Sequence, residues 1–116
     1  MPVARTFSGP LHKKSYEYAL HIVFFFKELI ERKEFVLSKQ LLRSATSVGA
    51  NIEEGQQAQS RSDFVAKMSI ALKEACESRF WLRLLQDGGF CDKNRSDVLI
   101  DETEEIISML SRVLTS

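Results

Sequence analysis

The chain has 116 residues, with sixteen Lys plus Arg, sixteen Asp plus Glu and a formal net charge of zero at pH 7. This length supports one domain with a single hydrophobic core and excludes two independent domains. The neutral balance argues against a dedicated nucleic-acid binder, which usually carries a net positive charge. The number and spacing of the two cysteines do not suggest a disulfide framework. This indicates a reducing compartment, so we predict a cytoplasmic protein.

The charge is unevenly distributed along the chain. Residues 1–52 carry +4, residues 53–90 carry −1 and residues 91–116 carry −3. Such an asymmetry favours a one-sided anionic partner or neighbouring copies that pack head to tail, and the alternative is chance variation on solvated helix faces. The candidate nucleic-acid or anion-binding residues are Lys13, Lys14, Lys33, Lys39 and Arg43.

The longest apolar run near the N-terminus covers residues 22–26 and is far shorter than the roughly 18 residues that a membrane span needs. Charged residues follow it, where a secretory signal would carry a small-residue cleavage site. We therefore expect neither a membrane partner nor a targeting segment.

The first predicted helix covers residues 14–32, where apolar residues recur at spacings of three and four. Both prolines precede it, so residues 1–11 are expected to form a loose arm before a bundle domain of residues 12–116. The predicted core stripe of this helix consists of Tyr16, Ala19, Leu20, Val23, Phe26 and Ile30.

Three successive phenylalanines, Phe24, Phe25 and Phe26, lie on this helix. Successive residues of an α-helix point about 100° apart, so the three rings cannot all enter one core. We assign Phe24 and Phe25 to an interface with a second copy of the chain. A short strand over residues 22–26 is the competing interpretation.

The second predicted helix covers residues 37–57. Small residues beside its apolar stripe allow another helix to approach closely, which offsets the roughly 1 kcal/mol that Gly49 costs in a helix interior. Asn51 is polar where the pattern approaches the core, and we expect it to be buried and to fix the register of the helices. The stripe consists of Leu41, Ala45, Val48 and Ile52.

The third helix is expected to begin at a capping box formed by Ser60 and Asp63 and to end at the Gly88-Gly89 pair. Its core stripe consists of Phe64, Met68, Ala71, Ala75, Ser78, Leu82 and Leu85. A second apolar set consists of Ile70, Leu72, Phe80, Trp81 and Leu84. One small core does not need both sets, so Phe80 and Trp81 join the candidate oligomer interface.

A fourth helix is predicted from residue 93 or 96 to residue 114. Its stripe consists of Leu99, Thr103, Ile106, Leu110 and Val113. Four helices with short connections predict an all-α fold, an antiparallel up-down-up-down four-helix bundle.

Motifs for metal binding and catalysis are weak. Neither His12 nor His21 follows a Glu by three residues, as a di-iron bundle site requires. Cys76 and Cys91 are fifteen residues apart, which is not a zinc-ligand spacing. We predict no metal, no cofactor and no enzyme. An enzyme that uses Cys91 or a carboxylate pair is a further, weaker hypothesis.

Residues 40–55, QLLRSATSVGANIEEG, resemble the signature of the four-helix-bundle proteins encoded by intervening sequences within bacterial 23S ribosomal RNA genes. The resemblance continues through residues 62–85 and covers residues 12–114 in all. The signature positions include Arg43, Asn51, Glu54 and Gly55, for which the family offers no catalytic role.

This resemblance implies a bundle that assembles as a ring-shaped homopentamer. A relative, the accessory variability determinant of diversity-generating retroelements, is a basic pentamer that binds nucleic acid and a partner reverse transcriptase. The neutral charge of this chain departs from that relative. We therefore favour a non-enzymatic scaffold or adaptor, with a nucleic-acid-binding accessory protein for structured RNA or DNA as the alternative. That alternative requires the five basic residues to gather into one patch once the ring forms.

Overall fold

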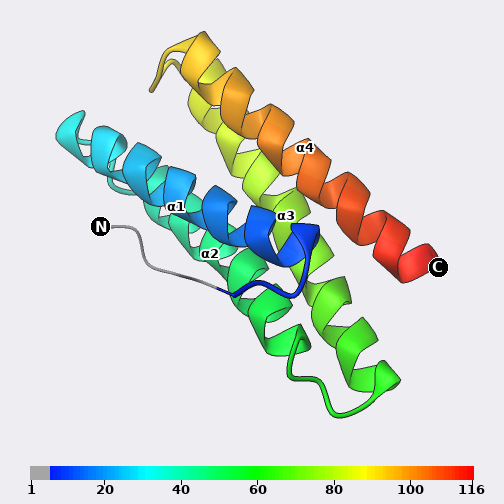
Figure 1. Ribbon diagram of the computed structural model, residues 1–116. Helices are drawn as coiled ribbons and strands as arrows, with labels where there is room; N and C mark the ends of the chain where they lie inside the picture. The colour runs from blue at the N-terminus through cyan, green and yellow to red at the C-terminus, as the bar shows by residue number, and fades with distance from the viewer. Residues whose placement is uncertain (1–5) are drawn as a thin grey trace.

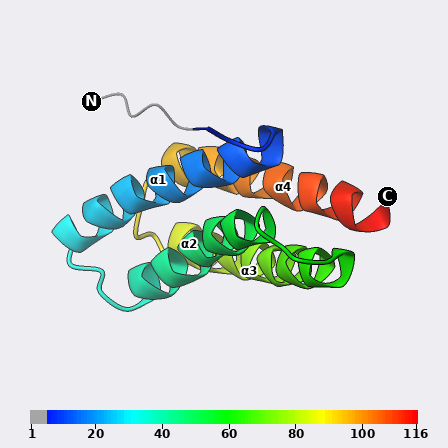
Figure 2. The same ribbon diagram turned by 60° about the horizontal axis from the view of Figure 1, so that its bottom comes forward.

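Four α-helices joined by short connections form the described part of the chain, residues 6–116, in a computed structural model. They are α1 (Pro10–Glu31), α2 (Leu37–Gly55), α3 (Arg61–Asp87) and α4 (Lys93–Thr115). Consecutive helices run in opposite directions (Figure 1), and α4 returns to pack against α1. Figure 2 shows α1 and α4 in one layer over α2 and α3. The predicted antiparallel four-helix bundle is confirmed.

Helix α1 begins at Pro10, earlier than its apolar pattern predicted. Proline suits the first helical position because its missing N–H has no partner there in any helix. Of the predicted arm, residues 1–5 lie outside the described residues. The Phe7 ring, just before the helix, packs edge-on against the His12 ring with centroids 5.0 Å apart.

The core face of α1 is rotated from the predicted stripe. Its buried residues are His12, Ser15, Tyr18, Ile22, Phe25 and Leu29. Tyr16 and Leu20, assigned to the core, are instead about two-fifths exposed. The prediction was wrong because α1 carries two interleaved apolar stripes with the same spacing. The inner one also includes the polar residues His12 and Ser15.

The predicted stripes of the other three helices form the core as expected. Leu41, Ala45, Val48 and Ile52 of α2 are completely buried. Six of the seven predicted positions in α3 and three of the five in α4 are also completely buried, and Leu99 is nearly so. Helix α3 begins as predicted, with the Ser60 hydroxyl accepting a hydrogen bond from the Asp63 N–H at 3.0 Å.

Two polar contacts cross this core. The hydroxyls of Thr103 on α4 and Tyr18 on α1 lie 2.7 Å apart, and those of Ser44 on α2 and Ser78 on α3 lie 2.9 Å apart. Burial raises the pKa of Tyr18 to about 12, so its hydroxyl stays protonated and retains its hydrogen bond. Within residues 6–116, every buried side-chain polar atom has a hydrogen-bond partner.

The start of α2 is capped by a carboxylate that precedes it. Val36, at the N-cap position, offers no side-chain oxygen. The buried Glu34 carboxylate instead accepts hydrogen bonds from the backbone N–H groups of Val36, Leu37 and Ser38 at 3.3, 3.2 and 2.6 Å. Burial acts to raise the pKa of Glu34, but these hydrogen bonds outweigh it and the pKa is lowered overall. The ionised side chain therefore stabilises the helix end.

Glu34→Gln is expected to lower the free energy of unfolding by about 1–2 kcal/mol near neutral pH. Because the folded-state pKa lies below the unfolded one, this contribution is present above the unfolded pKa and disappears as the pH falls through the folded value. Urea titrations of both proteins at about pH 7 and about pH 3 measure the difference. Glu31→Gln, at an exposed position nearby, is the matched control and should show no such pH-dependent difference.

No helix in the described part of the chain is both long and apolar enough to span a membrane.

Candidate functional site

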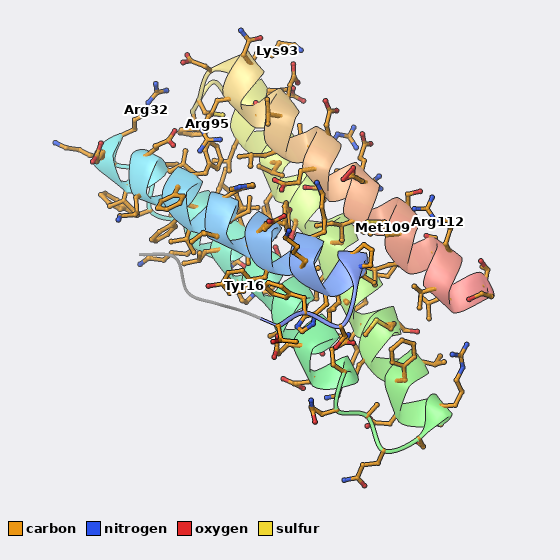
Figure 3. All side chains as sticks on the ribbon, viewed as in Figure 1. Tyr16, Arg32, Lys93, Arg95, Met109 and Arg112 are labelled. Carbon is orange, nitrogen blue, oxygen red and sulfur yellow. The ribbon has the colours of Figure 1, made fainter. Side chains whose placement is uncertain are left out.

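One exposed apolar face lies along the outside of α1. Tyr16, Leu20 and Phe24 follow one another at spacings of four residues, and each is between 40% and 50% exposed. Tyr16 lies near the N-terminal end of α1 (Figure 3). We call these three residues the α1 face. Phe24, assigned to an oligomer interface from the sequence, belongs to it.

Phe25 does not belong to this face, which corrects the sequence-based assignment. Its ring is completely buried between the helices of one chain, with the Arg95 guanidinium 5.3 Å from its centroid. Neighbouring residues point about 100° apart on a helix, so Phe25 enters the core whereas Phe24 faces outward. Phe25 is therefore unavailable to a second copy.

A second exposed apolar face lies on α3. It consists of Phe80 and Leu84, which are one turn apart, and of Ile70, about 15 Å further toward the start of the helix beyond Lys73 and Glu77. The three apolar residues are between 39% and 53% exposed. Trp81 lies beside this face and is half-buried against the core. Its Nε1–H donates a hydrogen bond to Glu77 at 2.9 Å, and its ring meets Phe80 edge-on with centroids 5.1 Å apart. Trp81 therefore contacts both the core and the Phe80 ring. We call the three exposed residues the α3 face.

Within one chain, the five candidate basic residues are not gathered into a single patch. Lys13 lies in the first turn of α1 and Lys33 in the turn just after its last residue, so most of the length of the helix separates them. Lys39 is exposed in the first turn of α2, near the Lys33 end. Lys14 forms an ion pair with Glu105 of α4 at 2.6 Å, a contact that raises the pKa of this lysine. Its charge is thus already partnered.

Arg43 is also partnered, by two carboxylates of α3. Its guanidinium donates hydrogen bonds to Glu74, at 3.4 Å, and to Glu77. The hydrogen bond from Trp81 and the contact with Arg43 lower the pKa of Glu77. An anion would have to displace these carboxylates to reach Arg43.

The other signature residues lie along the same contact between α2 and α3. Asn51 is only half-buried and donates hydrogen bonds to the carbonyl and hydroxyl of Ser47 in its own helix, so the expected buried contact that fixes helix register is not observed. Glu54 accepts a hydrogen bond from Lys67 at 2.8 Å. A Cβ atom at Gly55 would overlap the Met68 methyl group. The signature thus describes how α2 packs on α3.

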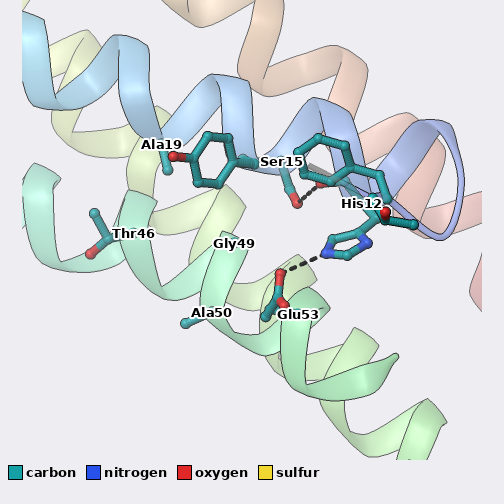
Figure 4. A pocket seen from close by; sticks show the side chains of 10 residues that line it. His12, Ser15, Ala19, Thr46, Gly49, Ala50 and Glu53 are labelled. Carbon is teal, nitrogen blue, oxygen red and sulfur yellow. Dashed lines mark hydrogen bonds and ion pairs between the residues drawn. The ribbon is translucent and has the colours of Figure 1, made fainter. Parts of the chain in front are cut away.

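A groove of about 530 Å³ lies between α1, α2 and the segment before α1 (Figure 4). Its floor includes Gly49, where α1 and α2 lie close together: a Cβ there would lie 3.3 Å from the Ser15 carbonyl oxygen. At one end, His12 Nε2 lies 2.6 Å from a carboxylate oxygen of Glu53. Sequence reasoning missed this pair. The residues are 41 positions apart, and only the close packing permitted by Gly49 brings their helices together.

Gly49→Leu is expected to lower the free energy of unfolding by about 1–3 kcal/mol, because the new side chain must push α1 away from α2. Urea denaturation measures the loss. Ala50→Leu is the matched control, since Ala50 is exposed on the next position of the helix and should tolerate the change within about 0.5 kcal/mol. Equal losses in the two variants would contradict the close approach at Gly49.

The chemistry available to catalysis is limited in the described residues. No group of three or more His, Cys, Asp or Glu side chains there is arranged to hold a metal ion. Cys76 and Cys91 are half-buried, and neither forms a disulfide. Burial raises the pKa of Cys91, so at neutral pH the side chain is a thiol and not the nucleophilic thiolate.

The family model for the 23S rRNA-intervening sequence protein matches residues 10–112, nearly the whole chain. The chain belongs to this family. A crystal structure of a protein of unknown function from the S23 ribosomal protein family of Bacteroides thetaiotaomicron VPI-5482 aligns with a TM-score of 0.90 and 44% sequence identity. The alignment covers 92% of this chain and 100% of that one. No curated protein gives a match. The family resemblance inferred from residues 40–55 is therefore confirmed.

Proposed function

We propose that the protein assembles with itself into a ring, a homopentamer as the family resemblance implies, and acts as a non-enzymatic cytoplasmic scaffold or adaptor. The observation that carries this proposal is the pair of exposed apolar faces on one small bundle. Large contiguous apolar patches on a protein surface mark interaction sites. The family match and its structural neighbour name no substrate or reaction.

The placement of the two faces favours a ring over a symmetric dimer. Helix α1 packs against α2 and α4, and α3 packs against the same two helices, so α1 and α3 stand diagonally across the bundle. The α1 face and the α3 face therefore point away from one another. A contact between two different faces is heterologous, and heterologous contacts build a ring when the rotation between successive copies closes and an open filament when it does not. The family resemblance implies the closed ring. We infer that the α1 face of one copy binds the α3 face of the next.

Light scattering coupled to gel filtration tests this proposal on the purified wild-type protein at micromolar concentration. The expected mass is five times that of the 13.3 kDa chain. The mass should persist after nuclease treatment and in about 1 M salt, because apolar contacts are not screened by ions. A mass of one chain would overturn the proposal. A mass that falls after nuclease treatment would favour the nucleic-acid-binding alternative.

A further inference from the structure

His12 is buried at one end of the α1–α2 groove and is hydrogen-bonded through both ring nitrogens. The backbone N–H of Ser8 donates to Nδ1 at 2.9 Å, and Nε2 lies 2.6 Å from Glu53 Oε1 (Figure 4). The residue is only 7% exposed. A nitrogen that accepts a hydrogen bond carries no proton, so these partners assign the neutral ring with its hydrogen on Nε2, donated to Glu53.

The His12 ring anchors the segment that precedes α1. Ser8 is tied to it by the backbone hydrogen bond, and Phe7 packs on it edge-on with an interplanar angle of 82°. The Phe7 ring also lies 5.8 Å from the Tyr16 ring, and Thr6 and Phe7 line the groove. The segment is therefore held over one wall of the groove by the hydrogen bond from Ser8 to His12 and by the contacts of the Phe7 ring with His12 and Tyr16.

We propose that His12 is a pH-sensitive latch that holds residues 6–9 on the groove when neutral and releases them when protonated. Protonation places a hydrogen on Nδ1, so two donors, this N–H and the Ser8 N–H, then face each other. The imidazolium keeps its contact with the Glu53 carboxylate on α2 but loses Ser8. The segment that carries Phe7 then leaves Tyr16, and the groove opens.

The described lining of the groove contains no charged side chain other than Glu53 that would offset this change. Among the described residues that line the groove, Glu53 is the only charged side chain and Tyr16 on α1 is the only other titratable one. The preceding segment contributes Thr6 and Phe7, which do not titrate. Lys13 follows His12 on α1 but is exposed and does not line the groove.

Nuclear magnetic resonance of the wild-type protein between about pH 8 and about pH 5, the range in which imidazoles titrate, tests the latch. As the His12 ring protonates, the hydrogen-exchange protection factor of the Ser8 amide is expected to fall about tenfold. The nuclear Overhauser contact between the Phe7 and Tyr16 rings should disappear with the same midpoint. Far-UV circular dichroism should remain unchanged, because the four helices stay folded.

Two substitutions at one position separate the two hydrogen bonds. In His12→Asn, the amide oxygen takes the place of Nδ1, accepts from Ser8 and cannot be protonated, so the segment should stay in place at every pH. In His12→Gln, the amide reaches toward Glu53 but offers no acceptor near Ser8, so the segment should be released at every pH. Both variants report on the latch even if one of them is less stable.

The chain supplies its own control, because His21 is its only other histidine. His21 lies on α1, and its Nδ1 lies 2.9 Å from a carboxylate oxygen of Glu102 on α4, away from the groove. His21→Asn should leave the transition at Ser8 unaltered. The proposal is overturned if the Ser8 amide and the ring contact do not change while His12 titrates, if His12 does not titrate in this range, or if the transition persists in His12→Asn.

Discussion

Phe25→Ala is expected to lower the free energy of unfolding by about 3–5 kcal/mol, the usual cost of emptying a buried aromatic site. The Phe25 ring is completely buried among core residues of α1 and its neighbours, so the substitution leaves a cavity that the packed helices cannot fully close. Equilibrium urea denaturation followed by circular dichroism measures the loss.

Phe35→Ala provides the matched control for this prediction. Phe35 lies on the connection between α1 and α2, outside both exposed faces, and is 47% exposed. The same truncation there removes little buried surface and should cost less than about 1 kcal/mol. Similar losses in the two variants would contradict the assignment of Phe25 to the core.

Phe24→Asp and Phe80→Asp are each expected to convert the assembly into single chains of 13.3 kDa. Every contact in the proposed ring joins one α1 face to one α3 face, so a buried charge on either face disrupts all contacts at once. Both side chains are at least half exposed in the single chain, so the bundle itself should stay folded. Light scattering gives the mass, and circular dichroism checks the fold.

Val98→Asp is the control for these two variants. Val98 lies on α4, outside both faces, and is 63% exposed, more than either Phe24 or Phe80. The same charge introduced there should leave the mass of the assembly unchanged. If Val98→Asp also yields single chains, the loss of assembly would reflect added charge in general and not the two faces.

The sequence was sufficient to predict the bundle because the core stripe of α2, α3 and α4 follows an unbroken alternation of four- and three-residue spacings. In α2, the stripe from Leu41 to Ile52 is flanked by small or polar residues, so a single rotation of the helix satisfies it. In α1, apolar residues occur almost all round the helix. Which of Phe24 and Phe25 enters the core then depends on where α2 and α4 lie. The spacing of apolar residues within one segment carries no information about the positions of other helices.

The candidate sites were less predictable because their contacts join distant segments. The partners of Arg43 lie on α3, 31 and 34 residues away, and His12 meets Glu53 across 41 residues. The sequence showed the basic side chains and two histidines, but not the carboxylates that face them. The apolar surplus on α3, by contrast, was visible in the sequence, since Phe80 and Leu84 fall outside a stripe that was already complete.

The proposed contact between the α1 face and the α3 face is tested most directly by the mass of an equimolar mixture of Phe24→Asp and Phe80→Asp. The first variant keeps an intact α3 face and the second keeps an intact α1 face, so each mixed pair can form one contact but no ring. The account predicts single chains for each variant alone and a two-chain complex in the mixture, measured by light scattering. Two-chain complexes in either variant alone, or single chains in the mixture, would contradict it.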